Sequence, residues 1–172
     1  MPNHCNNLLT REDGKSVLDD LTPYISQRSS SPGYKDGYTF NFDAIIPIDE
    51  EGLGEHNDSW YDWRVNNWGT KWCGYDGHFN DDQTAFMFDT AWSPPTPIIK
   101  KLAELTDRTF ALRYLEEGMF FCGKYVVGPD VELDDHYHCL TQAPQELKNL
   151  FGYVPHEDNS HTSNQIKSND TI

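Results

Sequence analysis

Two histidines could bind a metal ion. His136 and His138 are two positions apart, so an extended backbone would place both imidazoles on the same side. Neighbouring aspartates could add a carboxylate, and His4 with Cys5 could join them if the fold brings these segments close. No second pair at conventional ligand spacing accompanies them. A solvated loop or ordinary packed histidines explain the same residues, so a metal-dependent enzyme acting on a nucleotide or nucleic acid is an alternative function.

The carboxylates offer a second kind of chemistry. Glu116 and Glu117 could act as general acid and base, but a glutamate pair before a glycine is also ordinary hairpin-turn sequence. Lys71, Asp76 and Asp89 could form a polar pocket among the tryptophans, or they could orient that segment by hydrogen bonds and salt bridges. The sequence has no nucleophile elbow, phosphate loop or zinc-hydrolase signature. We therefore expect no catalytic residue and no cofactor.

All five tryptophans lie between residues 60 and 92. Large aromatic side chains stabilise either a core or a recognition surface. We expect Trp68, Trp72 and Trp92 to form a second core on the open face of a sheet, which leaves Trp60 and Trp63 as anchors beside an acidic segment. The predicted partner-binding residues are Asp49, Glu50, Glu51, Glu55, Asp58, Trp60, Asp62, Trp63, Glu116 and Glu117.

Charge narrows the choice of partner. The chain of 172 residues has 28 acidic and 13 basic residues, which gives a formal net charge of −15. Direct binding of nucleic acid is disfavoured, because proteins that bind the phosphate backbone supply Lys and Arg. An acidic protein is instead attracted to basic surfaces, including those with which other proteins hold nucleic acid. Solubility alone is the competing explanation of the charge.

The length and composition of the chain also limit the class of protein. A chain of this length fits one domain. Its apolar runs are only a few residues long and its start lacks a basic and apolar leader, so we expect no membrane span and a location in the cytoplasm. Four scattered cysteines without a C-x-x-C pair predict free thiols.

Hydrophobic periodicity predicts the elements that position these residues. Alternating apolar residues predict strands at 4–10, 38–43, 85–92, 109–115 and 119–127. Stripes at helical spacing predict helices that begin at Ser16 and Thr96, and shorter helices at the start of 60–72 and at 144–151. Pro23 should end the first helix early. Segments 27–37, 49–58 and 74–82 are predicted loops.

The order of these elements predicts an α+β fold. Two strand-helix-strand units make a ferredoxin-like split βαβ sandwich, in which an antiparallel sheet has two helices on one face. We expect this domain at 1–128, with an aromatic, Trp-rich insertion at about 49–82 and an extra C-terminal hairpin strand. An acidic extension with a short helix follows at 129–154. Residues 155–172 have almost nothing apolar to bury, which predicts a disordered tail.

Several motifs carry a resemblance to a known family. They are the start M-P-N-H-C-x-N-x-L-T, the strand F-D-A-I-I-P, the segment N-N-W-G-T-K-W-x-x-Y-D, the strand F-x-T-A-W-S-P-P-x-P-I-I and the hairpin Y-x-x-E-G-x-x-F-x-G. Over roughly residues 1–128 the sequence resembles the YubB-type ferredoxin-like family of phage and plasmid proteins. The resemblance implies the fold and an origin in a mobile genetic element, but this family has no established function to transfer.

The charge, the missing catalytic signatures and the resemblance together lead to one expected function. We expect a non-enzymatic acidic protein that blocks a basic, nucleic-acid-handling surface of a host defence complex, as an anti-CRISPR or anti-restriction inhibitor would. Its partner would be a basic host protein or ribonucleoprotein complex in the cytoplasm of a bacterial cell. A further alternative is a homo-oligomeric accessory protein joined through an open sheet edge.

Overall fold

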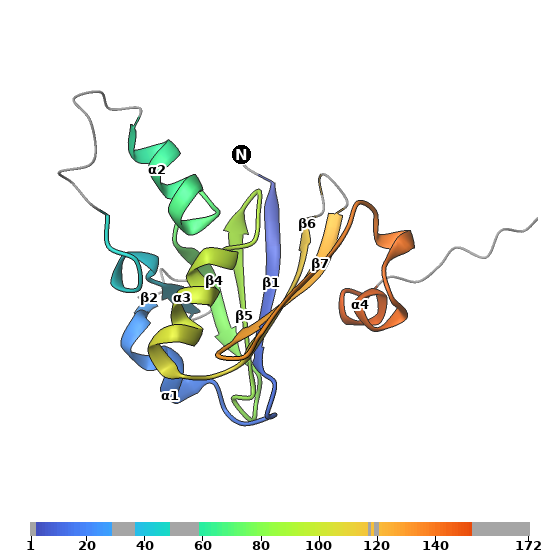
Figure 1. Cartoon of the computed structure of the whole chain (residues 1–172), viewed down its shortest axis with the longest axis horizontal. Helices are drawn as coiled ribbons and strands as arrows, with labels where there is room; N and C mark the ends of the chain where they lie inside the picture. Colours follow the sequence, from blue (N-terminus) through green and yellow to red (C-terminus); the bar gives the residue numbers. More distant parts are fainter. Residues whose placement is uncertain (1–2, 29–36, 49–58, 117, 119–120, 153–172) are drawn as a thin grey trace, which may run out of the picture.

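Strands and helices are described in a computed structural model that covers residues 3–28, 37–48, 59–116, 118 and 121–152 (Figure 1). The strands are β1 (His4–Arg11), β2 (Ile25–Arg28), β3 (Gly37–Phe40), β4 (Gly74–Phe79), β5 (Ala85–Ala91), β6 (Phe110–Glu116), β7 (Phe121–Gly128) and β8 (Val131–Tyr137). The α-helices are α1 (Leu18–Leu21), α2 (Ser59–Trp68), α3 (Thr96–Thr106) and α4 (Gln145–Leu150). Short 3₁₀ turns occur at Thr22–Tyr24, Phe42–Ala44 and Leu140–Gln142.

The described strands form one antiparallel sheet in the order β2-β3-β4-β5-β1-β6-β7-β8. Its centre, β4-β5-β1-β6, has the strand order of a ferredoxin-like domain. β1 lies between β5 and β6, and α3 connects these two flanking strands. The predicted α+β, ferredoxin-like fold is therefore confirmed. The extra hairpin strand is β7, which pairs with β6.

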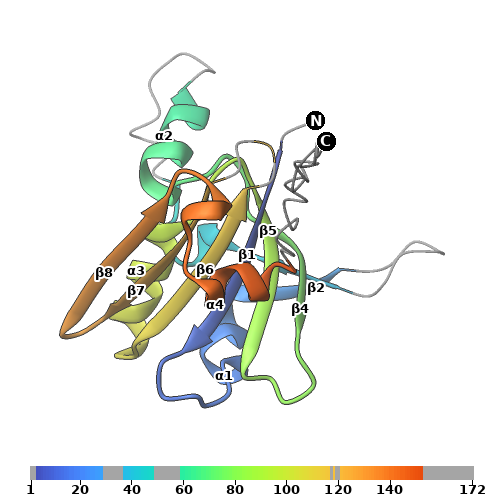
Figure 2. The ribbon, with the colours of Figure 1, turned by 90° about the vertical axis from the view of Figure 1, so that its right-hand side faces the viewer.

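Helices cover both faces of the sheet. Figure 1 shows α1, α2 and α3 on one side and α4 on the other, and Figure 2 shows α4 in front of the sheet with α3 behind it. The main core lies between the sheet and the first three helices. Its large, fully buried side chains include Leu9, Phe40, Phe42, Trp68, Phe86, Ile98, Ile99, Leu102, Phe110 and Leu112. A smaller core of Leu115, Cys122, Ala143 and Leu147 lies under α4.

The predicted helices are confirmed with small changes. α1 ends at Leu21, and Pro23 lies in the 3₁₀ turn that follows, as expected. In α3 the stripe is displaced, because Ile99 and Ala103 are buried whereas Leu105 is 51% exposed. Among the described residues, no helix is long and apolar enough to cross a membrane.

Strand β4 corrects the prediction of a loop at 74–82. It pairs with β5 on one side and β3 on the other, so it takes the place in the ferredoxin-like unit expected for residues 38–43. Glycines weaken the strand signal, but they are required here. A Cβ atom at Gly77 would lie 2.6 Å from Phe86 Cζ, and one at Gly74 would lie 2.8 Å from Phe88 Cδ2. The glycines make room for two buried rings of β5.

The described part of the predicted insertion consists mainly of α2 and β4. α2 lies on the same side of the sheet as α3 and contacts it, rather than lying over the open face or an edge. The Trp-rich segment therefore supplies a helix and a strand of the two main layers.

The predicted acidic extension contains one more strand. β8 pairs with β7 along its length and forms an outer edge of the sheet. Its carboxylates at Glu132, Asp134 and Asp135 are exposed. Helix α4 confirms the short helix predicted at 144–151, and the predicted tail at 155–172 lies outside the described residues.

Candidate partner-binding site

Two segments with unusual sequences face each other at one end of the sheet. One is W-G-T-K-W at 68–72, which begins at the last residue of α2, and the other is T-A-W-S-P-P at 90–95, which leads from β5 to α3. The Thr70 hydroxyl donates a hydrogen bond to the Ala91 carbonyl at 2.8 Å, and the Ser93 hydroxyl donates one to the Gly69 carbonyl. Gly69 has a left-handed φ of 80°, which turns the chain after the helix.

A buried polar chain supports the second segment from below. Asn7 Nδ2 on β1 donates to Thr90 Oγ1 at 2.9 Å, and Thr90 Oγ1 donates to the Ser93 carbonyl at 2.8 Å. Asn7, Thr70 and Thr90 are all buried. Hydrogen bonds between buried groups are costly to break, so the backbone of both segments is held firmly.

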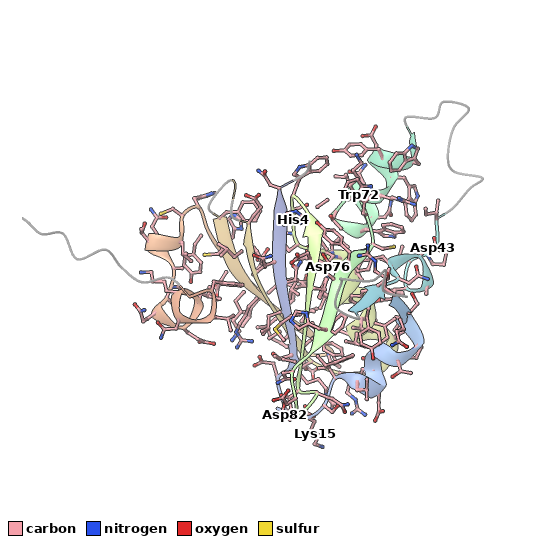
Figure 3. All side chains as sticks on the ribbon, turned by 180° about the vertical axis from the view of Figure 1, so that it is seen from behind. His4, Lys15, Asp43, Trp72, Asp76 and Asp82 are labelled. Carbon is pink, nitrogen blue, oxygen red and sulfur yellow. The ribbon has the colours of Figure 1, made fainter. Side chains whose placement is uncertain are left out.

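The two segments and α2 build a cage of aromatic rings around a lysine. Lys71 Nζ lies 4.9 Å from the ring centroid of Trp72, 5.3 Å from that of Trp92 and 5.6 Å from that of Tyr61. These distances are typical of cation–π interactions. We call Tyr61, Lys71, Trp72 and Trp92 the lysine cage. Trp72 and Trp92 are each 37% exposed, so the cage belongs to the surface. Figure 3 places Trp72 near α2, with Lys15 and Asp82 at the opposite end of the molecule.

Trp92 reaches this surface through an unfavourable backbone conformation. Its φ is 66°, which bulky residues rarely adopt and which costs on the order of 1–2 kcal/mol. Its backbone N–H donates to the Asn3 carbonyl at 3.0 Å, which helps to hold the conformation. Non-glycine residues with such strain occur preferentially at functional sites.

A second cation is held by the tryptophans of α2. The Arg64 guanidinium lies 5.1 Å from the ring centroid of Trp60 and 4.8 Å from that of Trp68. Trp68 is fully buried, and its indole N–H donates to the Ile46 carbonyl at 2.9 Å. Arg64 and Trp60 therefore extend the aromatic surface from the core outward along α2.

The structure divides the predicted partner-binding residues into three groups. Asp49, Glu50, Glu51, Glu55, Asp58 and Glu117 lie outside the described residues. Trp60, Asp62 and Trp63 lie on α2; Asp62 is exposed, and Trp63 is half-buried against the core. Glu116 is 0% exposed, so in this structure its carboxylate does not belong to an exposed acidic surface.

Of the three tryptophans expected in a second core on the open face, Trp68 is buried as predicted, whereas Trp72 and Trp92 are not. Trp72 and Trp92 are partly exposed rather than core residues, because the loop after α2 and the left-handed backbone turn their rings outward. Trp68 itself lies on the helix side of the sheet, not on the open face. The sequence places Lys71 beside Trp72, but Tyr61 and Trp92 join the cage only through the fold.

The polar pocket considered for Lys71, Asp76 and Asp89 is not assembled. Lys71 lies in the cage, Asp76 forms an ion pair with Arg28 at 3.1 Å, and Asp89 accepts a hydrogen bond from Asn6 Nδ2 at 2.8 Å. Asp76 and Asp89 line one shallow pocket, but Lys71 does not, so the three do not form one site.

The two candidate metal ligands do lie near each other. The ring centroids of His136 and His138 are 5.2 Å apart, and His136 Nδ1 is 3.1 Å from the Tyr114 hydroxyl. Within the described ranges, no three His, Cys, Asp or Glu residues are grouped so that they could hold a metal ion.

The neighbouring Cys139 is expected to be the most readily alkylated of three thiols. A hydrogen bond with the Thr141 hydroxyl lowers the pKa of Cys139, whereas burial raises the pKa of Cys5 and Cys122. At pH 8 a larger fraction of Cys139 is thiolate, the reactive form. Iodoacetamide labelling followed by peptide mass spectrometry should find Cys139 modified at least tenfold faster than the other two. Equal rates would contradict this order.

Comparison with known proteins supports the fold of this region. Residues 67–148 match the family model described as the ferredoxin-like domain in Api92-like protein. The match supports a ferredoxin-like family of unknown function, and it includes Lys71, Trp72 and Trp92. No curated protein and no solved structure matches the chain significantly.

Proposed function

We propose that this chain is a non-enzymatic binding protein that docks on a basic surface of another protein through the lysine cage. The observation that carries the proposal is the exposure of Trp72 and Trp92 on a support held by buried hydrogen bonds. Tryptophan and tyrosine are the residue types that most often dominate the binding energy of protein interfaces. A firmly held ring also loses little conformational freedom on binding.

The charge of the chain supports a basic partner. A net charge of −15 attracts basic surfaces over long distances and speeds their encounter. Asp62 is exposed on the helix that carries Tyr61. The acidic segment 49–58 directly precedes this helix in the sequence. An aromatic anchor beside an exposed carboxylate fits a groove lined with Lys and Arg.

A more specific proposal concerns the identity of the basic partner. We take it to be a nucleic-acid-handling complex of host defence, such as a CRISPR effector or a restriction enzyme, which the chain inhibits. Its carboxylates would occupy the positions of phosphates, as in a DNA mimic. The resemblance to YubB-type proteins of phages and plasmids supports this choice. The chain would then act in the cytoplasm of a bacterial cell.

Replacing Trp92 by glycine tests the proposal, because binding and stability should respond differently. Glycine adopts the left-handed backbone without strain, which offsets part of the packing lost with the ring, so the free energy of unfolding should stay within about 1 kcal/mol of wild type. Binding should fall at least ~30-fold, the effect of losing about 2 kcal/mol at an interface centre. Urea denaturation measures the stability. A pull-down from a bacterial lysate, followed by titration of the captured protein, measures the binding.

A matched control separates the cage from exposed apolar surface in general. Leu105→Ala, on α3, removes a side chain that is 51% exposed and should leave binding unchanged. Wild-type binding should weaken steeply as salt rises to ~0.5 M, and nucleic acid bound by the partner should compete with it. A complex that withstands such salt, or that keeps its affinity in Trp92→Gly, would count against the proposal.

A further inference from the structure

Within the described residues, Lys71 interacts with aromatic rings. Among the described residues it has no hydrogen bond and no ion pair, although the chain contains 28 acidic residues. An ammonium group in this position can leave the cage without leaving unpaired any carboxylate that the structure describes. The cage therefore contains a cation that can be exchanged for another one.

The walls of the cage do not depend on Lys71 for their position. Trp72 lies two residues after Thr70, which is bonded to the Ala91 carbonyl, and Trp92 precedes Ser93, which is bonded to the Gly69 carbonyl. Tyr61 belongs to α2, and its ring centroid lies 6.3 Å from that of Trp92. Lys71 carries its charge on a flexible stem of four carbons. The side chain can rotate into solvent while the three rings keep their places.

We propose that the rings of Tyr61, Trp72 and Trp92 form a receptor for a cationic side chain, an arginine or lysine of the partner, and that Lys71 occupies this receptor until the partner replaces it. This inference rests on the proposed function for the source of the cation. The ring faces attract any cation of suitable size, and arginine also stacks on aromatic rings. Because the guest competes with a tethered lysine, binding to the wild-type cage is weakened by the high effective concentration of Lys71.

The experiment titrates the full chain with small probes, so it needs no partner. The probes are the blocked amino acids N-acetyl-arginine amide and N-acetyl-lysine amide, together with choline and its neutral shape analogue 3,3-dimethylbutan-1-ol. The proteins are wild type, Lys71→Ala and the double variant Lys71→Ala with Trp72→Leu. The indole N–H signals of Trp72 and Trp92 report binding at the cage by NMR, and circular dichroism checks that each variant is folded.

Removal of the resident lysine is expected to tighten binding. N-acetyl-arginine amide should bind Lys71→Ala at least tenfold more tightly than wild type, with shifts at both cage tryptophans. The double variant should lose this binding, and the neutral alcohol should bind at least tenfold more weakly than choline. Equal binding of the neutral and charged probes overturns the proposal, as does unchanged affinity in Lys71→Ala. Binding of choline without binding of either blocked amino acid overturns the assignment to a protein side chain.

The outcomes for this inference and for the proposed function can be told apart. A partner captured through Trp92, together with no gain of cation binding in Lys71→Ala, overturns the cage receptor alone. Tight binding of N-acetyl-arginine amide by Lys71→Ala, with no protein captured by wild type, supports the receptor and overturns the proposed function. With a captured partner in hand, Lys71→Ala should bind it more tightly than wild type does, and weaker binding would contradict the exchange.

Discussion

Replacing Trp68 by alanine is expected to lower the free energy of unfolding by about 3–5 kcal/mol, the usual cost of removing a buried tryptophan. The indole is fully buried and packs edge-to-face on Phe42 at a centroid distance of 5.9 Å. Its N–H also satisfies the Ile46 carbonyl, which the alanine variant would leave without this donor. In addition, Trp68 supports Arg64 and immediately precedes the glycine that turns toward the cage. Urea denaturation followed by circular dichroism would measure the change.

Trp72→Ala is the matched control, since it removes the same side chain from a position that is 37% exposed. Its effect on unfolding should be smaller, because about a third of the residue's surface is already in water. Trp68→Phe should fall between the two. If Trp68→Ala and Trp72→Ala destabilise the protein equally, the distinction between a core tryptophan and a surface tryptophan is wrong.

Replacing Gly77 by alanine is expected to destabilise the protein by about 2 kcal/mol or more, although only one methyl group is added. The new Cβ would lie 2.6 Å from Phe86 Cζ and 2.8 Å from the Tyr38 carbonyl oxygen. Phe86 is fully buried, with Phe79 and Phe88 at centroid distances of 4.7 and 5.5 Å, so its ring has little room to move. The Tyr38 carbonyl oxygen belongs to the backbone of the paired strand β3. This backbone cannot move without disturbing the sheet.

Gly37→Ala gives the comparison within the neighbouring strand. Its Cβ would approach the Gly77 carbonyl only to 3.3 Å, a contact that small adjustments can relieve, so its cost should stay below about 1 kcal/mol. Thermal or urea unfolding of both variants tests the ranking. A Gly77→Ala protein as stable as Gly37→Ala would show that β4 does not approach Phe86 as closely as described.

Local sequence patterns predicted those elements whose signals are complete within a few residues. β5 alternates regularly, and α3 has proline in its first turn together with an apolar stripe, so both were predictable. β4 was missed because glycine weakens a local strand pattern. Gly74 and Gly77 are required by the rings of another strand, and the local sequence does not show those contacts. The ferredoxin-like order was still predicted correctly, since the strand predicted at 38–43 took the same place in the order of elements, between the first helix and β5.

The cage was missed for a related reason. It exists because residues 68–72 and 90–95 are brought together, and hydrogen bonds between distant segments have no local signature. The alternation of 85–92 also suggested that Trp92 shares the face of Phe88. A positive φ at Trp92 breaks that alternation and turns the ring out of the core, and only the folded backbone shows it.

The acidic strand β8 has a consequence for how copies of the protein meet at high concentration. As an outer strand it offers free backbone N–H and C=O groups, to which a strand of another molecule could add. Pairing two such edges would bring Asp134 and Asp135 close to the same carboxylates of the second copy, and like charges facing each other across strands repel, whereas Glu132 is already paired with Lys100 at 2.7 Å. The two aspartates therefore protect the edge against aggregation. Part of the negative charge serves the chain's own solubility, independently of any partner that the cage receives.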